Sequence, residues 1–290
     1  MIIPADIPQS FHRIFQNNYN AITKNSQNLF LFAGDHKLEK LNLINPEILF
    51  KLASNQEVGC FATHLGLIAR YGNQYPNINY IVKLNGKSNL LKTSKYRSFF
   101  MPIQKALQKS TILHDPVSRQ LWSVDDALSL QKNSGLNIRG VGYSVYLGSS
   151  YESDMLHEAA RIVHEAHQRG LIAILWMYPR GYSVKNEFDG HIIAGAAGVA
   201  AELGADFAKI KAPLSQNIHW LKIAVESAGN TKIVISGGEK QNSENFLEEI
   251  ETLIAQTGIV GVAVGRNIFE CKPDQAQEMI KKISALVYKK

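Results

Sequence analysis

The sequence is poor in cysteine and has no long apolar run. Its 290 residues include two cysteines, Cys60 and Cys271, too few for a disulfide framework. Cys60 lies in the apolar stretch VGCFAT, where we expect a buried thiol. No segment approaches the roughly 20 apolar residues that a membrane span needs, and the first residues, MIIPADIPQSFHRIF, lack the pattern of a secretion signal. We therefore predict a cytoplasmic protein without disulfides and without a membrane partner.

Signatures of nucleic-acid and metal binding are also missing. The net charge of +6 comes from basic residues spread along the chain, with some bunching between Lys83 and Lys109. No helix-turn-helix, zinc-finger or RNA-binding pattern accompanies them, so the charge indicates a solvated surface or a cleft that attracts an anionic substrate. The segment HEAH at residues 164–167 lacks the i, i+4 histidine pair of a zinc protease. We interpret it as a polar helix face, and we predict no metal site.

What recurs along the chain is a short apolar strand followed by an amphipathic helix. Eight such repeats in about 250 residues predict a closed (βα)8 barrel. An open, doubly wound sheet is the alternative, although no G-x-G-x-x-G follows the first strand. The strands are mostly β-branched or aromatic, as buried parallel strands tend to be, and they are expected at Leu29–Ala33, Val58–Thr63, Asn79–Leu84, Gly140–Tyr146, Leu171–Met177, Asp206–Ile210, Lys232–Ser236 and Ile259–Val264.

We predict one barrel domain over residues 1–290, with two additions to the repeat. Residues 1–27 form an N-terminal arm with a short helix, and residues 85–122 form a long, basic connection after the third strand. A connection of this length is more often a functional or packing surface than a spacer. Among the helices, Ser153–Arg169 is expected to end at Gly170, and another is expected to start at Ser123 with a capping-box-like Asp126.

The sixth strand offers a candidate nucleophile. Active sites of such barrels lie at the carboxyl ends of the strands, and Phe207, Lys209 and Lys211 share one face because they are two residues apart. A lysine in a buried strand is costly unless it is paired or used. A second cation about 6 Å away disfavours the charged amine by about 3 kcal/mol at an effective dielectric constant near 20. We predict Lys209 as a Schiff-base nucleophile. The alternative is a lysine without a catalytic role, whose side chain extends to solvent at the rim of the barrel.

Two other strand ends carry groups suited to proton transfer. In the first strand the parity directs Asp35 into the barrel mouth and Phe30 and Phe32 towards the helices. Asp35 is either a carboxylate that moves protons or holds a substrate hydroxyl, or a turn residue. In the fifth strand Trp176 and Tyr178 share a face. They either pack the mouth or place a phenol within reach of an imine carbon.

Glycines and basic residues at the remaining strand ends predict phosphate binding. Many barrels hold phosphate in the loops after strands seven and eight, because glycine lets backbone N–H groups approach an anion and arginine adds a bidentate contact. The candidates there are Ser236, Gly237, Gly238, Gly265 and Arg266. Further candidates for a phosphate or for sugar hydroxyls are Lys83, Asn85, Ser88, Arg180 and Lys211.

At these residues the chain resembles the archaeal-type class I fructose-1,6-bisphosphate aldolases, part of a wider group of Schiff-base barrels that includes deoxyribose-phosphate aldolase. The matching motifs span most of the chain in the right order. They are AGDH (33–36), VKLNGKS (82–88), GVGYSVYLGS (140–149), LWMYPRG (175–181), GADFAK (204–209), ISGGEK (235–240) and VGRNIF (264–269). The resemblance places the family's phosphate-binding turns on the last two of these motifs.

The resemblance implies an imine mechanism that needs neither metal nor cofactor and acts on a phosphorylated sugar. It implies Lys209 as the Schiff-base lysine, Tyr178 as the acid and base, and Asp35 as the family's aspartate, with Trp176 beside the tyrosine. Family members are often large rings, so a homo-oligomer, such as a decamer built from pentamers, is expected.

The chain departs from the family in three places, namely Lys37, Lys211 and the long segment after strand three. These departures leave the substrate more open than the mechanism. Our hypothesis is a lyase that reversibly cleaves fructose 1,6-bisphosphate to dihydroxyacetone phosphate and glyceraldehyde 3-phosphate. The alternatives are an aldolase, transaldolase or thiolase that acts on another phosphorylated ketone or sugar through the same imine, and a barrel that serves as a non-catalytic scaffold.

Overall fold

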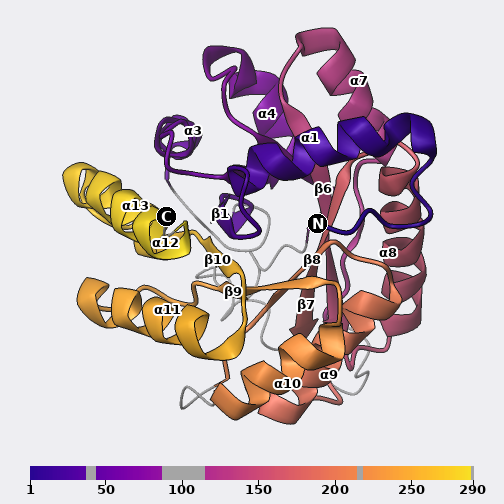
Figure 1. Cartoon of the computed structure of the whole chain (residues 1–290), viewed down its shortest axis with the longest axis vertical. Coiled ribbons are helices and arrows are strands. Elements are labelled where there is room, and N and C mark those ends of the chain that lie inside the picture. The colour runs from indigo at the N-terminus through magenta and orange to yellow at the C-terminus, as the bar shows by residue number, and fades with distance from the viewer. Residues whose placement is uncertain (37–43, 87–114, 214–217, 289–290) are drawn as a thin grey trace, which may run out of the picture.

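Eight parallel strands close into a barrel in the computed structural model, which describes residues 1–36, 44–86, 115–213 and 218–288. Around the barrel the strands follow the order β1-β10-β9-β8-β7-β6-β3-β2. The helices form a ring outside the strands (Figure 1). The predicted (βα)8 barrel is confirmed. Its strands are β1 (Leu29–Ala33), β2 (Cys60–His64), β3 (Tyr80–Lys83), β6 (Ile138–Leu147), β7 (Ile172–Pro179), β8 (Phe207–Ile210), β9 (Lys232–Ser236) and β10 (Gly261–Val264).

All eight strands lie where the sequence predicts them, with ends shifted by at most two residues. They form because apolar side chains on both faces can be buried, one face in the barrel and the other under the helices. Phe32 stacks on Phe61 at a centroid distance of 5.4 Å, and Phe61 packs edge-on against Phe50 of the helix layer at 5.2 Å. The outward orientation predicted for Phe32 is therefore confirmed.

The helices begin and end at the residue types that favour these positions. Ser123 forms a capping box with Asp126, as predicted, and Gly170 has the positive φ of 66° that ends a helix and turns the chain into β7. The helices, including two 3-10 turns, are η1 (Gln9–Phe11), α1 (His12–Thr23), α3 (Pro46–Ala53), α4 (Leu65–Tyr71), η2 (Gly72–Gln74), α7 (Val124–Ser134), α8 (Glu152–His167), α9 (Gly190–Glu202), α10 (Ile218–Ala228), α11 (Ser243–Thr257), α12 (Arg266–Phe269) and α13 (Pro273–Val287).

The N-terminal arm contains the expected helix, α1, and it covers the amino end of the barrel. Tyr19 stacks on Phe207 at 5.5 Å. Asn18 donates a hydrogen bond to the carbonyl of Gly170, just before β7, at 2.8 Å, and Asn79, just before β3, donates to the carbonyl of Ala21 at 3.2 Å. The carboxyl ends of the strands are therefore the end available for a site.

The long connection predicted at residues 85–122 is described only at its two ends. There β4 (Asn85–Gly86) pairs with β5 (Arg119–Gln120) in an antiparallel ladder beside the barrel. Ser88, proposed above as a phosphate ligand, and Lys37 lie outside the described residues.

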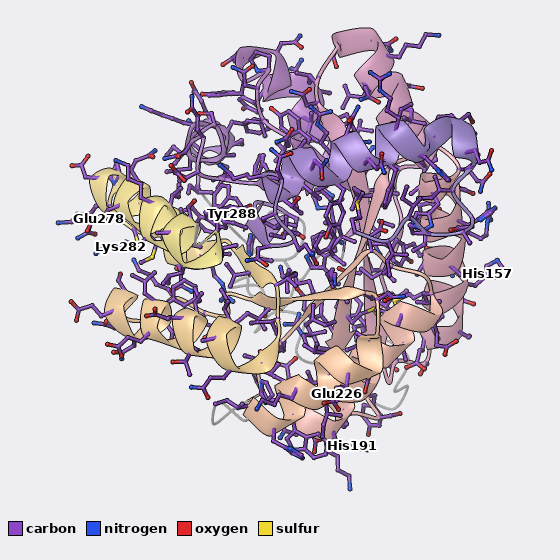
Figure 2. All side chains as sticks on the ribbon, viewed as in Figure 1. His157, His191, Glu226, Glu278, Lys282 and Tyr288 are labelled. Atoms are coloured by element: carbon purple, nitrogen blue, oxygen red, sulfur yellow. The ribbon has the colours of Figure 1, made fainter. Side chains whose placement is uncertain are left out.

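The interpretation of the HEAH segment of helix α8, residues 164–167, as a polar helix face is wrong for His167. His157 lies on the outer, solvent-exposed face of α8, as expected (Figure 2). His167, however, is 1% exposed and lies between two carboxylates, Asp6 of the arm at 2.8 Å and Asp206 at 3.3 Å. A helical period of 3.6 places His167 on the inner face, where the paired carboxylates make its burial tolerable. Across the residues that the structure describes, no helix is both long and apolar enough to cross a membrane.

Candidate active site

Lys209 lies at the carboxyl end of β8 and points into the open mouth of the barrel. Its side chain is 6% exposed, and it lines a cavity of about 750 Å³ that the carboxyl ends of the strands and the loops after them enclose. Its Nζ lies 5.5 Å from the centroid of the Trp176 indole. A primary amine that is almost buried yet borders a cavity is placed to attack a carbonyl group.

The indole of Trp176 orders two amines. Lys83 of β3 places its Nζ 5.2 Å from the same ring, and Trp176 is completely buried. Close packing against Gly142 of β6 fixes the ring, because a Cβ at Gly142 would lie 2.2 Å from the indole Cζ3. Each ammonium gains a favourable interaction with the π-face. Trp176 is thus a platform that sets the position of Lys209.

Lys83 and Asn85 form a buried pair beside this platform. The Lys83 amine donates to the Asn85 carbonyl at 3.0 Å and to its side-chain oxygen at 2.7 Å. Asn85 in turn donates to the carbonyl of Ser144 at 2.9 Å and accepts from its N–H at 2.8 Å. Both side chains are 0% exposed. The pair cross-links β3 to β6 below the cavity, and neither residue is among those that line it.

Asp35 supplies the carboxylate of the site. It follows β1, is 4% exposed, and its Oδ1 lies 3.9 Å from Nδ1 of His36. Burial alone would raise the pKa of Asp35, but the positive charges of His36, Lys209 and Lys83 outweigh it and hold the pKa below its usual value. The carboxylate is therefore ionised at neutral pH and close enough to Lys209 to interact with it electrostatically.

Tyr178 and Arg180 form one side of the cavity at the end of β7. The Arg180 guanidinium lies 4.7 Å from the centroid of the Tyr178 ring, and both residues line the cavity. Glu187, from the following loop, accepts from Arg180 at 2.8 Å and from Lys211 at 2.6 Å. Burial opposes ionisation of Glu187, but the two cations hold its pKa below the usual value.

This contact changes the role expected for Lys211. The sequence suggested Lys211 as the second cation that disfavours the charge on Lys209, whereas the structure gives it a carboxylate partner and seats it 4.3 Å from the ring centroid of Phe188. Its charge is compensated by Glu187. The amine that shares the indole with Lys209 is instead that of Lys83.

Two glycine turns, after β9 and after β10, form another side of the cavity. Gly265 has no room for a side chain, because a Cβ there would lie 2.4 Å from His36 and 2.7 Å from the carbonyl of Ala33, and Gly238 has a φ of 65°. Asn267 joins the turns by donating to the carbonyl of Gly237 at 2.6 Å. Backbone N–H groups without side chains in front of them suit an anion. Arg266, which opens α12, borders the same cavity.

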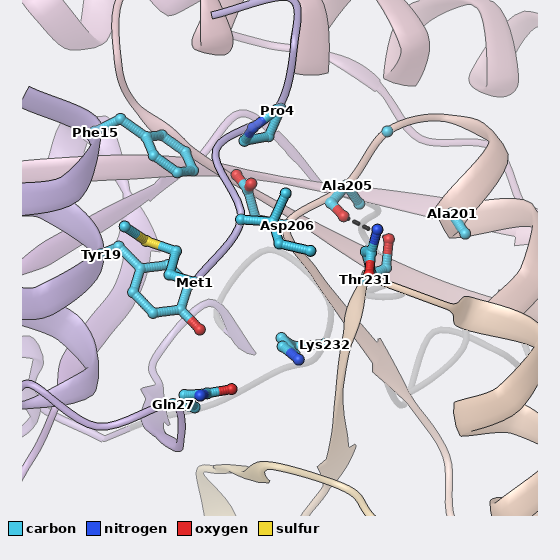
Figure 3. Close-up of a pocket in the computed structure, with 13 residues that line it drawn as sticks. Met1, Pro4, Phe15, Tyr19, Gln27, Ala201, Ala205, Asp206, Thr231 and Lys232 are labelled. Carbon is cyan, nitrogen blue, oxygen red and sulfur yellow. Dashed lines mark hydrogen bonds between the residues drawn. The ribbon is translucent and has the colours of Figure 1, made fainter. Parts of the chain in front are cut away.

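A second cavity, of about 380 Å³, lies at the amino end of the barrel (Figure 3). Tyr19, Asp206 and Lys232 line it together with the first residues of the arm. Asp206 accepts hydrogen bonds from the Ala173 N–H at 2.8 Å and from His167 at 3.3 Å. Lys209 and the residues at the carboxyl ends of the strands do not line it, so the cavity at the mouth is the candidate active site.

Most of the residues singled out from the sequence meet at the mouth. The cavity is lined by Tyr178, Arg180, Lys209, Lys211, Ser236, Gly237, Gly238, Gly265 and Arg266. Asp35, Trp176, Lys83 and Asn85 lie buried around or beneath it. Sequence reasoning missed Glu187, Asn267 and His64. Glu187 lies in a loop and Asn267 in the four-residue helix α12, where no strand parity indicates direction, and His64 ends β2 without a basic or glycine neighbour to mark it.

A nearly buried amine that shares a cavity at the carboxyl end of a barrel with a phenol, and that interacts with a nearby carboxylate, is suited to form an imine with a carbonyl substrate. The fold and the site place this chain in the class of imine-forming barrel enzymes. A family model of the DeoC/LacD family aldolases matches residues 23–271. The chain therefore belongs to the DeoC/LacD family of aldolases, and the resemblance found in the sequence is confirmed.

Similar proteins agree in fold and in reaction class. A fructose-bisphosphate aldolase/6-deoxy-5-ketofructose 1-phosphate synthase of Methanocaldococcus jannaschii is 44% identical over 296 residues, which cover 98% of this chain and 89% of the relative. The structure of a fructose-bisphosphate aldolase from Slackia heliotrinireducens has a TM-score of 0.88 and 39% identity, covering 99% and 89% of the two chains. An archaeal fructose-1,6-bisphosphate aldolase, whose catalytic lysine is bound to the carbinolamine intermediate, has a TM-score of 0.76 and 29% identity over 94% and 99%.

Proposed function

We propose that this enzyme is a class I fructose-1,6-bisphosphate aldolase. The observation that carries the proposal is the position of Lys209, which borders the mouth cavity and contacts the face of Trp176, with Asp35 close enough to interact electrostatically. Relatives named fructose-bisphosphate aldolase match nearly the whole chain, and one of them, 31% identical over 98% of the chain, is named fructose-bisphosphate aldolase class 1. A bisphosphate requires two anion sites, and the glycine turns and the pair Arg180 and Lys211, which all line the cavity, would supply them.

The reaction follows from the groups present. The neutral Lys209 amine attacks the C2 ketone, and loss of water gives a protonated imine. Asp35 accepts the proton of the C4 hydroxyl as the C3–C4 bond breaks; the bonding electrons flow into the iminium, which becomes an enamine, and glyceraldehyde 3-phosphate leaves. Tyr178 then gives a proton to C3 of the enamine. Hydrolysis of the resulting iminium releases dihydroxyacetone phosphate, the neutral amine and a proton, which replaces the proton taken up when the iminium formed. The proton on Asp35 then passes through solvent to the Tyr178 oxygen, so that both groups return to their starting states.

Product analysis tests this proposal. Purified enzyme, treated with a metal chelator, is incubated with fructose 1,6-bisphosphate, and both triose phosphates are measured by coupled dehydrogenases. We expect equal amounts of the two products with chelator present, and none from Lys209→Ala. A Lys209→Ala variant that still produced both trioses would contradict the assignment. Turnover that the chelator abolished would contradict the metal-free mechanism.

A second candidate reaction shares the imine but uses a different aldehyde. The M. jannaschii relative also carries the name 6-deoxy-5-ketofructose 1-phosphate synthase. The product in that name can be divided at its C3–C4 bond. The two parts are then dihydroxyacetone phosphate and a three-carbon 2-oxoaldehyde that carries no phosphate. In this chain Glu187 already compensates Arg180 and Lys211, so that side of the cavity also suits an aldehyde that carries no phosphate.

A panel of aldehydes separates the two reactions. Dihydroxyacetone phosphate is supplied as the donor, with glyceraldehyde 3-phosphate or methylglyoxal as the acceptor, and kcat/KM is compared. A preference for glyceraldehyde 3-phosphate supports the bisphosphate aldolase. A preference of more than about tenfold for methylglyoxal would make the second reaction the principal one.

We further propose that the enzyme works in the cytoplasm as a homo-oligomer. Both cysteines are free thiols, which a reducing compartment preserves. Ile2 and Ile14 of the N-terminal arm are 70% and 44% exposed and offer apolar surface for a second copy. The mass of the particle in solution tests the assembly: a single chain at micromolar concentration would contradict it.

A further inference from the structure

His64 ends β2 and has a fixed orientation at the barrel mouth. Its Nδ1 lies 3.0 Å from the carbonyl oxygen of Lys83, and its ring packs against Trp122 at a centroid distance of 5.5 Å. Since a carbonyl oxygen only accepts, Nδ1 carries the hydrogen of this contact. In the neutral ring the second nitrogen, Nε2, is then a hydrogen-bond acceptor.

The imidazole of His64 is neutral at physiological pH. Burial and the positive charge of Lys83 lower the pKa of His64 to about 4, against the opposing effect of the Asp35 carboxylate. The side chain is 5% exposed, and its Nε2 makes no hydrogen bond of normal geometry in the described part of the chain, although the backbone of Asp35 lies close enough to the ring to affect its pKa. Buried polar atoms are rarely left without a partner, and exceptions in enzymes often mark where a ligand group binds.

The strand order places His64 on the same side of the mouth as Asp35. β2 pairs with β1, which leads to Asp35, and with β3, where His64 stands level with Lys83. Tyr178 is the penultimate residue of β7, and β3 and β6 separate this strand from β2. A substrate held on Lys209 would therefore have the phenol on one side and the pair Asp35 and His64 on the other.

We infer that Nε2 of His64 accepts a hydrogen bond from the substrate hydroxyl whose proton Asp35 removes, and so holds that hydroxyl in the orientation that C–C cleavage needs. The inference rests on the proposed aldolase reaction and adds a residue to it. Unlike Asp35, His64 keeps its own protonation state throughout. It binds only the half of the substrate that leaves as the aldehyde, because dihydroxyacetone phosphate has no C4 hydroxyl.

Two substitutions test the roles of the two ring nitrogens separately. In His64→Asn the amide N–H can still reach the Lys83 carbonyl, as Nδ1 does, but no acceptor remains at the Nε2 position. In His64→Gln the longer amide can place an oxygen near the Nε2 position. Both variants are first compared with the wild type by thermal unfolding, to establish that they fold.

Two reactions are then measured on each variant. One is cleavage of fructose 1,6-bisphosphate, which needs the C4 hydroxyl. The other is exchange of the C3 hydrogen of dihydroxyacetone phosphate with deuterated water, which needs Lys209 and Tyr178 but no C4 hydroxyl. We expect kcat for cleavage by His64→Asn to fall about 100-fold, with exchange changed less than about threefold. For His64→Gln, kcat for cleavage should be at least about tenfold higher than for His64→Asn.

The other outcomes contradict the inference. Equal losses of cleavage and exchange, or equal losses in Asn and Gln variants, would show that His64 serves packing alone. Wild-type cleavage in His64→Asn would show that Nε2 has no part in the reaction. If the wild-type enzyme catalyses neither reaction, the proposed function itself fails, which is a different result from a defect confined to the variants.

Discussion

The contact between Gly142 and Trp176 allows the position of the reactive amine to be disturbed without touching a charged group. A methyl group at residue 142 would lie 2.2 Å from Cζ3 and 2.5 Å from Cη2 of the indole, whereas ordinary contacts begin at 3.4 Å. In Gly142→Ala the ring must therefore move by about 1.2 Å, or the strand must yield. The Nζ atoms of Lys83 and Lys209 both lie on this ring and would move with it.

We expect Gly142→Ala to lose activity out of proportion to its stability. Overpacking in a core costs about 1–3 kcal/mol in the free energy of unfolding. A shift of about 1 Å at a reacting group costs about 100-fold in rate. The assays are urea unfolding followed by tryptophan fluorescence, and kcat/KM for fructose 1,6-bisphosphate under conditions where the variant is fully folded.

A matched control distinguishes a local effect from general strain. A Cβ at Gly72 would lie 2.5 Å from Leu136 Cδ1, a similar clash with an apolar side chain outside the mouth. We expect Gly72→Ala to be destabilised with kcat/KM within about threefold of the wild type. If Gly142→Ala keeps wild-type kcat/KM, or if both variants lose activity equally, then the indole does not position Lys209.

Two further predictions concern charges around and away from the site. Glu187→Gln should release Lys211 and Arg180 from their carboxylate partner. The KM for fructose 1,6-bisphosphate should then fall by about threefold relative to the KM for fructose 1-phosphate. An unchanged ratio of the two KM values would show that these cations bind no phosphate. At the amino end, burial lowers the pKa of His167, but Asp206 and Asp6 outweigh it and raise the pKa above its usual value. A raised histidine pKa gives stability that is complete below the unfolded pKa of about 6.5 and is lost as pH rises through the folded value. The free energy of unfolding should therefore fall as the pH rises above about 6.5, more steeply than in His167→Gln; equal slopes would contradict the assigned charge.

The barrel could be predicted from the sequence because its strands are short apolar runs with helices between them. Period-two alternation also predicts the direction of the side chains at the strand ends, so the sequence alone predicts Asp35, Tyr178 and Lys209 at one mouth. The same rule succeeded for Phe32, which stacks on Phe61, the ring that packs against Phe50 of the helix layer.

The partners of these side chains could not be predicted, because they come from elements whose direction no period describes. Glu187 lies in the loop after β7, and its ion pair changes the role of Lys211. His167 was read as polar surface because its carboxylate partners, Asp6 and Asp206, are 161 and 39 residues away in the chain. Contacts of this kind depend on how the arm and loops fold over the barrel, and short-range patterns carry no information about them.

Covalent trapping tests the central claim, that an imine forms on the lysine of β8. The enzyme is incubated with dihydroxyacetone phosphate and sodium borohydride, digested, and mapped by mass spectrometry. The account predicts one adduct, a reduced triose phosphate on the peptide that contains Lys209, and no adduct in Lys209→Ala. An adduct of wild-type yield in Lys209→Ala, mapped to Lys211 or Lys83, would contradict it.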